Sequence, residues 1–229
     1  MGAMSQENQT VADDKRDRLL AAAERLFCEH GFHQTQVADI AKAAGTGIST
    51  FYRNFADKEE VMKVMLRELF DGMHDRFIAL RRGIEHRTPL EQFAMVRATF
   101  ALVLESLVKR PALLVALFRA GFIDAEIEGL TRAFLGEFVQ DLVDDLRRAE
   151  AAGLVEMPNG EVLATGLAGL ALQIAHRMVI EQKPGLEQAV DACTRFTLGG
   201  LLAFAPDAAF NELMPIYRML LRPAGAAGL

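Results

Sequence analysis

Residues 45–50, "GTGIST", have the composition of a turn that could hold a phosphate, because two glycines are followed by two hydroxyl side chains. Phosphate-binding glycine loops follow a β-strand, however, and Walker-type loops also contain a Lys. Here the preceding segment, 37–44, has apolar residues at helical spacing, and no Lys stands at the required position. The sequence therefore disfavours a nucleotide loop and leaves a turn between two helices.

Cys28, His30 and His33 are close enough in sequence to suggest a metal site. A structural zinc site needs about four ligands, and no fourth ligand follows at a usual spacing. The sequence also lacks an HExxH motif and a nucleophile elbow. We therefore predict no metal, no cofactor and no enzymatic activity, with a helical small-molecule-binding enzyme as the alternative.

The turn at Gly45 and Gly47 joins two short segments that each have one apolar face. In the second segment, 48–55, this face consists of Ile48, Phe51, Tyr52 and Phe55. Gly45 can adopt the left-handed conformation that ends a helix, and Gly47 can cap the next one. The pattern predicts a helix-turn-helix whose second helix is free to enter a DNA major groove.

The outward positions of the segment 48–55 carry polar side chains that suit base edges and phosphates, namely Ser49, Thr50, Arg53 and Asn54. A merely solvated helix surface is the alternative for Arg53 and Asn54. For Tyr52, we expect a buried ring with an accessible hydroxyl.

The helix after this segment should begin with a capping pair, Asp57 and Glu60. Lys58 stands at its first position, where a cation opposes the helix dipole. A DNA phosphate beyond Lys58 would explain that placement, and a solvated Lys is the alternative. Thr35 is expected to cap the helix 37–44 and to offer its hydroxyl, or the adjacent backbone amide, to a phosphate.

Helical periodicity runs through almost the whole chain and strand-like alternation is absent, so we predict an all-α protein. Gly, Pro and Asp punctuate it into helices at 14–30, 37–44, 48–55, 58–82, 89–109, 111–120, 125–152, 161–182, 186–204 and 208–220. Helices before residue 58 are short, and those after it are longer and rich in Leu, Phe and Met. We therefore expect a disordered tail at 1–12, a helix-turn-helix head at 13–58, a larger helical body at 59–220 and a flexible tail at 221–229.

The segment "GFHQTQVADIAKAAGTGISTFYRNFADKEEVMKVM", together with the preceding "RDRLLAAAERLFCEHGF", resembles the DNA-binding head of the TetR family of bacterial transcriptional regulators. The resemblance covers roughly residues 16–66. It implies that Thr35, Thr50, Tyr52 and Lys58 hold the DNA backbone, and that the turn, including Thr46 and Gly47, and the first residues of 48–55 face the bases. It departs at residues 46–49, where many members carry Val-Ser-Lys-Gly.

The same resemblance implies a homodimer and an effector cavity in the body. For the dimer interface we predict the last two long helices, which contain closely spaced small and apolar residues: Leu163, Gly166, Leu167, Leu170, Ile174, Leu198 and Leu201. For the cavity we predict apolar and aromatic residues with one polar anchor: Phe77, Phe100, Leu104, Phe118, Phe122, Phe138 and His176. Intramolecular packing is the alternative for both sets.

The chain carries 25 Lys and Arg against 31 Asp and Glu, a net charge of −6, which excludes a protein that coats nucleic acid nonspecifically. Two Cys make no disulfide framework, and the longest uncharged stretch, 162–176, is too short for a membrane span. We therefore expect a cytoplasmic repressor that a small hydrophobic or amphipathic effector releases from double-stranded operator DNA. An effector-free DNA-binding dimer is the second alternative.

Overall fold

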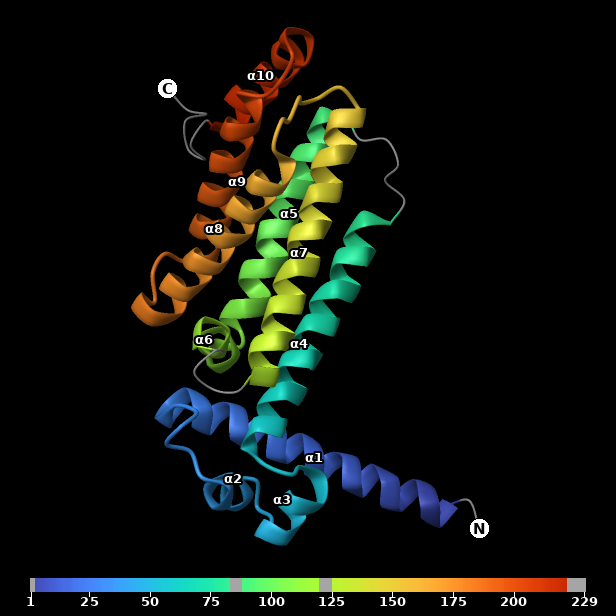
Figure 1. The fold of residues 1–229 in the computed structure, drawn as a ribbon, viewed down its shortest axis with the longest axis vertical. Coiled ribbons are helices and arrows are strands. Elements are labelled where there is room, and N and C mark those ends of the chain that lie inside the picture. The colour runs from blue at the N-terminus through green and yellow to red at the C-terminus, as the bar shows by residue number, and fades with distance from the viewer. Residues whose placement is uncertain (1–2, 83–87, 120–124, 222–229) are drawn as a thin grey trace, which may run out of the picture. The chain divides into compact units, whose positions relative to one another are not determined.

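The computed structural model describes residues 3–82, 88–119 and 125–221, and the regular secondary structure in them is α-helical (Figure 1). This confirms the predicted fold class. The helices are α1 (Ala3–His30), α2 (Val37–Ala43), α3 (Ile48–Asn54), α4 (Lys58–Arg81), α5 (Pro89–Val108), α6 (Pro111–Arg119), α7 (Ala125–Ala151), α8 (Gly160–Glu181), α9 (Leu186–Leu202) and α10 (Asp207–Leu221).

Helix α1 differs from its prediction because it begins at Ala3 rather than near residue 14. Residues 3–12, which we expected to be a disordered tail, are helical. The physical reason is that the stretch 3–30 contains neither Gly nor Pro, so each added residue extends the helix with one more backbone hydrogen bond. The expected tail at 221–229 lies outside the described residues except for Leu221, which ends α10.

The chain forms two compact units. The first comprises residues 1–71 and 110–131, and the second comprises residues 72–109 and 132–229. The first unit therefore holds more than the expected 13–58 head, since α6, the start of α7 and the first part of α4 group with it. Helix α4 is one continuous helix that contributes residues to both units.

The first unit is built around α1, whose carboxyl-terminal half packs against α2, while α2 packs against α3 (Figure 1). Its core contains the fully buried Leu19, Ile40 and Phe51. Helix α6 packs on α1, where Arg110 forms an ion pair with Glu24. Short helices such as α2 and α3 are stabilised mainly by this burial rather than by their own propensity.

The turn between α2 and α3 has the hydrogen bonds of a Schellman motif. Thr46 N–H donates to the carbonyl of Ala41 at 2.9 Å, and Gly45 N–H donates to the carbonyl of Lys42 at 3.1 Å. Gly45 is left-handed, with φ 65°, whereas Gly47 has φ −82° and is the N-cap of α3. The predicted roles of the two glycines in this turn are confirmed.

Replacing Gly45 by Ala is therefore expected to lower the free energy of unfolding of the first unit by about 1 kcal/mol, because a Cβ disfavours positive φ. Gly47→Ala is the matched control, because its backbone lies in the extended region open to any residue. Chemical denaturation of both variants checks the difference. Equal stability of the two variants would contradict the left-handed turn.

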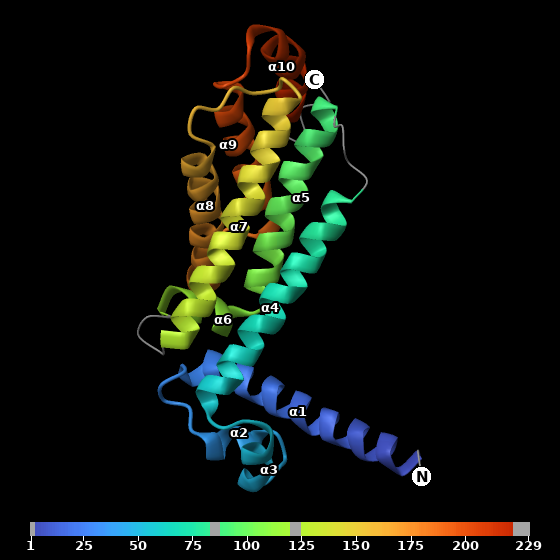
Figure 2. The same cartoon turned by 45° about the vertical axis from the view of Figure 1, so that its right-hand side comes forward.

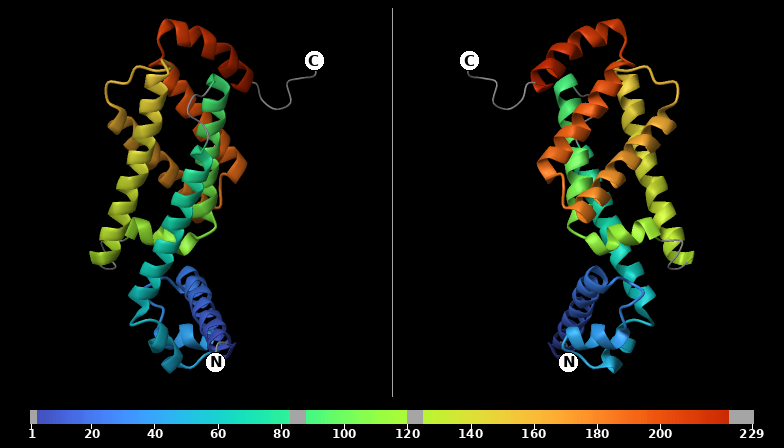
Figure 3. Two further views of the ribbon diagram at one scale, coloured as in Figure 1. Left: turned by 90° about the vertical axis from the view of Figure 1, so that its right-hand side faces the viewer. Right: turned by 90° about the vertical axis from the view of Figure 1, so that its left-hand side faces the viewer.

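The second unit is centred on α5, which packs most extensively against α9 and α8. In both Figure 1 and Figure 2, the axis of α7 follows nearly the same direction as that of α5. A capping box begins α5, with Glu91 N–H donating to Thr88 and the Glu91 carboxylate accepting from Thr88 N–H. Helix α10 packs on α9, as both views of Figure 3 show.

Candidate nucleic-acid interface and an apolar cavity

Helix α3 presents a polar outer face over a small aromatic core. Phe51 and Phe55 are buried, and their ring centroids lie 5.8 Å apart. Ser49 and Arg53 are exposed, and the side chains of Thr50 and Asn54 are half-buried. Four of the predicted contact residues are therefore on or near the surface of one short helix.

The predicted apolar face of α3 was wrong at Tyr52 and Ile48, which are exposed. Tyr52 is 57% exposed and Ile48 is 50% exposed, although their spacing from Phe51 and Phe55 suggested burial. The reason is that α3 has only two turns and packs mainly against α2, so its buried stripe is narrower than the periodicity implied. Tyr52 touches Phe51 edge-to-face at 5.5 Å and otherwise extends outward.

Hydrogen bonds hold the outer residues of α3 in place. The guanidinium of Arg53 donates to the hydroxyl of Thr50 at 3.3 Å, and the amide of Asn54 donates to the carbonyl of Thr50 at 2.7 Å. The predicted cap on the next helix is also present, since Asp57 accepts from Glu60 N–H at 2.7 Å. The end of α3 is thus joined to a well-capped start of α4.

Lys58 does not point to open solvent, because its ammonium has partners within the protein. Its ammonium donates to the carbonyls of Phe32, His33 and Thr35 at 2.9, 3.2 and 3.1 Å. It also lies 4.8 Å from the Phe32 ring centroid. An ammonium has three protons, so these three carbonyls use its donor capacity and offset its unfavourable position at the helix start. Lys58 ties the loop 31–36 to α4.

Thr35 is another correction. Its side chain is 2% exposed, and its hydroxyl donates to the carbonyls of Gly31 and Leu26, 2.9 and 3.3 Å away. Gln36, not Thr35, is the N-cap of α2, and its side chain makes no cap hydrogen bond. The Thr35 hydroxyl thus closes the carboxyl end of α1, whose last carbonyls need donors. It is not available to a phosphate.

The two turn residues of the predicted interface lie as expected at the α2–α3 junction. Thr46 is half-buried and its hydroxyl donates to the carbonyl of Ala41 at 3.3 Å. Gly47 is exposed. Gln36 and Lys42 are also exposed polar residues near this turn, and they were not among the predicted contact residues. Lys42 lies opposite the buried face of α2, and that periodicity was the signal that could have identified it.

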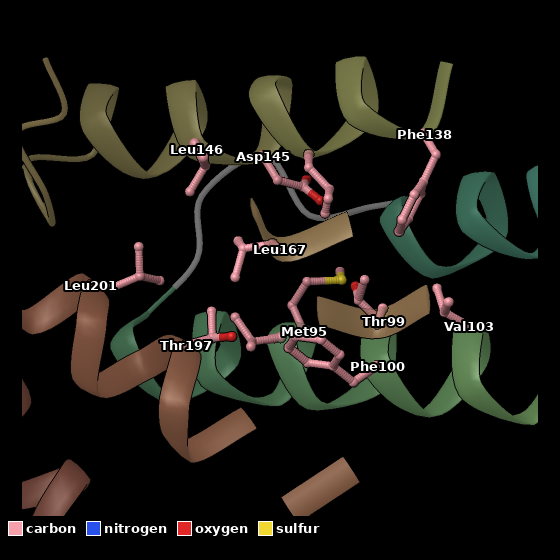
Figure 4. A pocket seen from close by; sticks show the side chains of 13 residues that line it. Met95, Thr99, Phe100, Val103, Phe138, Asp145, Leu146, Leu167, Thr197 and Leu201 are labelled. Atoms are coloured by element: carbon pink, nitrogen blue, oxygen red, sulfur yellow. The ribbon is translucent and has the colours of Figure 1, made fainter. Parts of the chain in front are cut away.

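The second unit contains a cavity of about 50 Å³ between α5, α7, α8 and α9 (Figure 4). Its lining from α5 includes Met95, Thr99 and Phe100, and α7 contributes Phe138, Leu142, Asp145 and Leu146. Leu167 and Ala171 of α8 and both Thr197 and Leu201 of α9 complete the wall. The surface is almost wholly apolar. Its volume is well below the roughly 300–1,000 Å³ of ordinary ligand pockets, so a ligand must displace side chains to enter.

The structure brings two of the seven predicted pocket residues, Phe100 and Phe138, to this cavity. Phe77 packs against Phe138 with ring centroids 5.5 Å apart, and Leu104 is buried but is not a lining residue. Phe118 is exposed and belongs to the first unit. The half-buried His176 is not among the lining residues, and Phe122 lies outside the described residues.

Asp145 is the charged residue in the cavity wall and is held by two arginines. Arg81 Nη2 lies 2.7 Å from its carboxylate and Arg148 lies 2.8 Å from it, while Arg81 also pairs with Asp141 at 3.4 Å. Burial opposes ionisation of Asp145, but the hydrogen bonds from Arg81 and Arg148 outweigh it and lower its pKa. The guanidinium of Arg81 lies 5.0 Å from the Phe77 ring centroid.

Helices α8 and α9 expose apolar side chains, although not the ones predicted. Val162 and Phe196 are 70% and 72% exposed, and Ile180 is exposed as well. Among the predicted interface residues, Leu167 and Leu201 line the cavity, Gly166 is exposed, and Leu163, Leu170, Ile174 and Leu198 are half-buried. Singly exposed apolar residues are common on protein surfaces, whereas a contiguous group of them marks a surface that meets another protein.

Helix α8 also has the length and composition of a membrane span, with 28% of its most apolar window buried. Its buried positions are Ala164, Ala168, Ala171, Ala175 and Met178, so four of the five are small, and the helix packs against α5 and α9. Among the described residues, no three metal-ligating side chains gather to form a metal site.

Residues 19–65 match the model of the family described as bacterial regulatory proteins, tetR family. Among curated proteins, the chain is 23% identical over 218 residues to the transcriptional activator FasR of Mycolicibacterium smegmatis, covering 87% of this chain and 89% of FasR. It is 31% identical over 74 residues to the transcriptional repressor KstR2 of the same organism, covering 32% of this chain and 36% of KstR2.

Several other curated relatives are matched over 32–48% of their own length. Among solved structures, AibR in complex with isovaleryl coenzyme A and operator DNA has a TM-score of 0.65 at 18% identity. That likeness covers 80% of this chain and 97% of AibR.

Proposed function

The chain belongs to the TetR family of bacterial transcriptional regulators, and from this premise we propose that it is a cytoplasmic, homodimeric repressor released from its operator by a small hydrophobic or amphipathic effector. DNA binding and transcriptional regulation are properties of the family. The observation that supports this chain's mode of binding is α3, a short helix with exposed Ser49, Tyr52 and Arg53 beside the left-handed turn at Gly45.

In this proposal, residues 13–58 read DNA and residues 59–220 bind the effector and dimerise. The first turns of α3, with Thr46, Gly47 and Ser49, approach the bases, while Thr50, Tyr52, Arg53 and Asn54 contact the backbone or the groove edge. Thr35 and Lys58 stabilise this surface without contacting DNA, because their polar groups donate hydrogen bonds to backbone carbonyls of the protein.

The dimer is proposed to form through the outward faces of α8 and α9. Support comes from the exposed Val162, Phe196 and Ile180, whose burial in a dimer would remove apolar surface from water. Such a dimer presents two reading helices to successive major grooves, about 34–36 Å apart.

The cavity of the second unit is the proposed effector site. The structural relative AibR is described in complex with isovaleryl coenzyme A, which supports an apolar acyl-sized group as one kind of occupant of this fold. Arg81, near the end of α4, pairs with Asp145 in the cavity wall, and Lys58, at the start of α4, ties down the loop 31–36. Helix α4 can therefore couple effector binding in the cavity to DNA binding by the helix-turn-helix, with a coupling free energy of about 1–3 kcal/mol.

The test is fluorescence anisotropy of the purified protein with duplex DNA from upstream of its own gene. Arg53→Ala is expected to weaken binding about 5- to 150-fold and to reduce the slope of log K against log salt by about one, if its guanidinium meets a phosphate. Arg147→Ala is the matched control, because Arg147 is an exposed arginine on α7 and is expected to leave both quantities unchanged.

Two outcomes would contradict the proposal. Salt-insensitive binding, or equal affinity for unrelated duplexes, argues against operator recognition by α3. The sign of regulation is tested with a reporter gene behind the same DNA. Repression in the absence of effector supports the proposal, whereas activation of the kind named for FasR overturns its repressor part and leaves the DNA-binding part intact.

A further inference from the structure

Thr197 of α9 is a buried polar group without a hydrogen-bond partner among the described residues. Its side chain is 5% exposed and lines the cavity, and Figure 4 shows its oxygen turned toward Met95 and Thr99 of α5. A buried hydroxyl without a partner costs stability. A group kept in this state at the wall of a cavity points to a partner that comes from outside the chain.

Thr194, one turn earlier in α9, shows that the helix itself offers the usual solution. Thr194 is equally buried, and its hydroxyl donates to the carbonyl of Val190 at 2.6 Å, four residues back. The corresponding bond is not made by Thr197, so its proton is free to be donated into the cavity.

The charges beside the cavity are already balanced. Asp141 and Asp145 supply two negative charges, and Arg81 and Arg148 supply two positive ones within ion-pair distance. A ligand carboxylate would be repelled by the negative charge of Asp145, and both arginines beside it are already paired. A ligand ammonium would have to compete with two arginines already bound to Asp145.

From these observations, we propose that Thr197 is the specificity-determining residue of the site; this inference rests on the effector role proposed above for the same cavity. The effector is an apolar molecule with an uncharged oxygen acceptor, such as a carbonyl or hydroxyl. That oxygen accepts a hydrogen bond from the Thr197 hydroxyl. Thr99 of α5 is the second hydroxyl within the lining. Met95, which lies between them in Figure 4, is the side chain displaced on entry, since its unbranched thioether is readily rearranged.

The experiment compares wild type, Thr197→Val and Thr194→Val, because Val matches Thr in shape and removes only the hydroxyl. Four probes with the same chain are used: octanamide, octan-1-ol, octanoate and octylamine. Thermal shift and calorimetry measure binding. We expect the amide and the alcohol to bind wild type more tightly than the two charged probes, and Thr197→Val to weaken their binding about tenfold.

The free proteins give an independent readout. Thr197→Val is expected to raise Tm, because it removes an unpaired buried hydroxyl, whereas Thr194→Val is expected to lower Tm and leave probe binding unchanged. A lower Tm for Thr197→Val shows that its hydroxyl has a partner in the folded protein and overturns the inference.

Three further results also overturn it: tightest binding of octanoate or octylamine, unchanged affinity for the neutral probes in Thr197→Val, or no binding of any probe to wild type. The last result includes the case in which the Thr197 hydroxyl serves only a buried water. Operator binding measured without any probe separates these failures from a failure of the proposed DNA-binding function.

Discussion

Replacing Arg81 by Met is expected to lower the free energy of unfolding by about 3 kcal/mol, because it leaves the largely buried Asp145 without its main partner. Arg81 and Asp145 are only 14% and 12% exposed, and three guanidinium-to-carboxylate distances between them are 3.2 Å or less. Arg148 remains beside Asp145 and limits the loss. Urea denaturation of the second unit measures it.

Two comparisons isolate the cause. Arg147→Met removes an exposed arginine that pairs with Asp144 three residues away, and it is expected to cost less than about 0.5 kcal/mol. The double variant Arg81→Met/Asp145→Leu removes both members of the buried pair and is expected to recover most of the lost stability. If the double variant is less stable than Arg81→Met alone, packing rather than charge explains the effect.

The same pair predicts the direction of a pH effect. Because the pKa of Asp145 is lowered in the folded protein, its contribution to stability is present above the unfolded pKa of about 3.9 and is lost as pH falls through the folded pKa. The gap in stability between wild type and Arg81→Met should therefore be full at neutral pH and narrow below about pH 4. A gap that stays constant down to pH 2 would falsify the ion-pair explanation.

Replacing Lys58 by Met is expected to weaken operator binding by about 10- to 100-fold without changing the salt slope, because charge-assisted hydrogen bonds of about 1.5–3 kcal/mol each hold the loop 31–36 in place. The three carbonyls bound by Lys58 belong to residues just before α2, so their release lets α2 and its Schellman turn shift. The measurement is anisotropy at several salt concentrations.

Arg53→Ala serves as the reference for this prediction. A residue that meets a phosphate lowers the slope of log K against log salt by about one when it is removed, whereas a residue that positions the interface lowers affinity at an unchanged slope. If Lys58→Met reduces the slope as Arg53→Ala does, then Lys58 contacts the DNA directly, and the carbonyl contacts are not its main role.

Helix positions could be predicted well because their signals are local. Gly31, Gly45 and Gly153 all have positive φ at the ends of helices, and each is a glycine that punctuates an apolar periodic segment in the sequence. The same local signals identified α3 and its outward Ser49 and Arg53. The start of α1 escaped prediction because residues 3–12 form a helix without an apolar stripe to mark it.

The partners of individual side chains could not be predicted in the same way. Lys58 binds backbone carbonyls 23 to 26 residues away, and a backbone carbonyl leaves no mark in the sequence. Phe100 and Phe118 look alike as aromatic residues on helices, yet only Phe100 lines the cavity, since α6 belongs to the other compact unit. Thr197 and Thr194 look equivalent in the sequence. Only the structure shows that the Thr197 hydroxyl does not make the hydrogen bond to a backbone carbonyl that Thr194 makes.

The exposed apolar residues of α8 and α9 all lie in the second unit, while α3 lies wholly in the first. In the proposed dimer, a chain whose helix-turn-helix is defective therefore keeps the α8 and α9 surface through which it pairs with an intact copy. In a cell that makes both chains, random pairing would leave most molecules with at least one defective reading helix. In the proposed dimer, head variants that weaken DNA binding, such as Arg53→Ala, should consequently behave as genetically dominant, and deletions that remove α8 or α9 should be recessive.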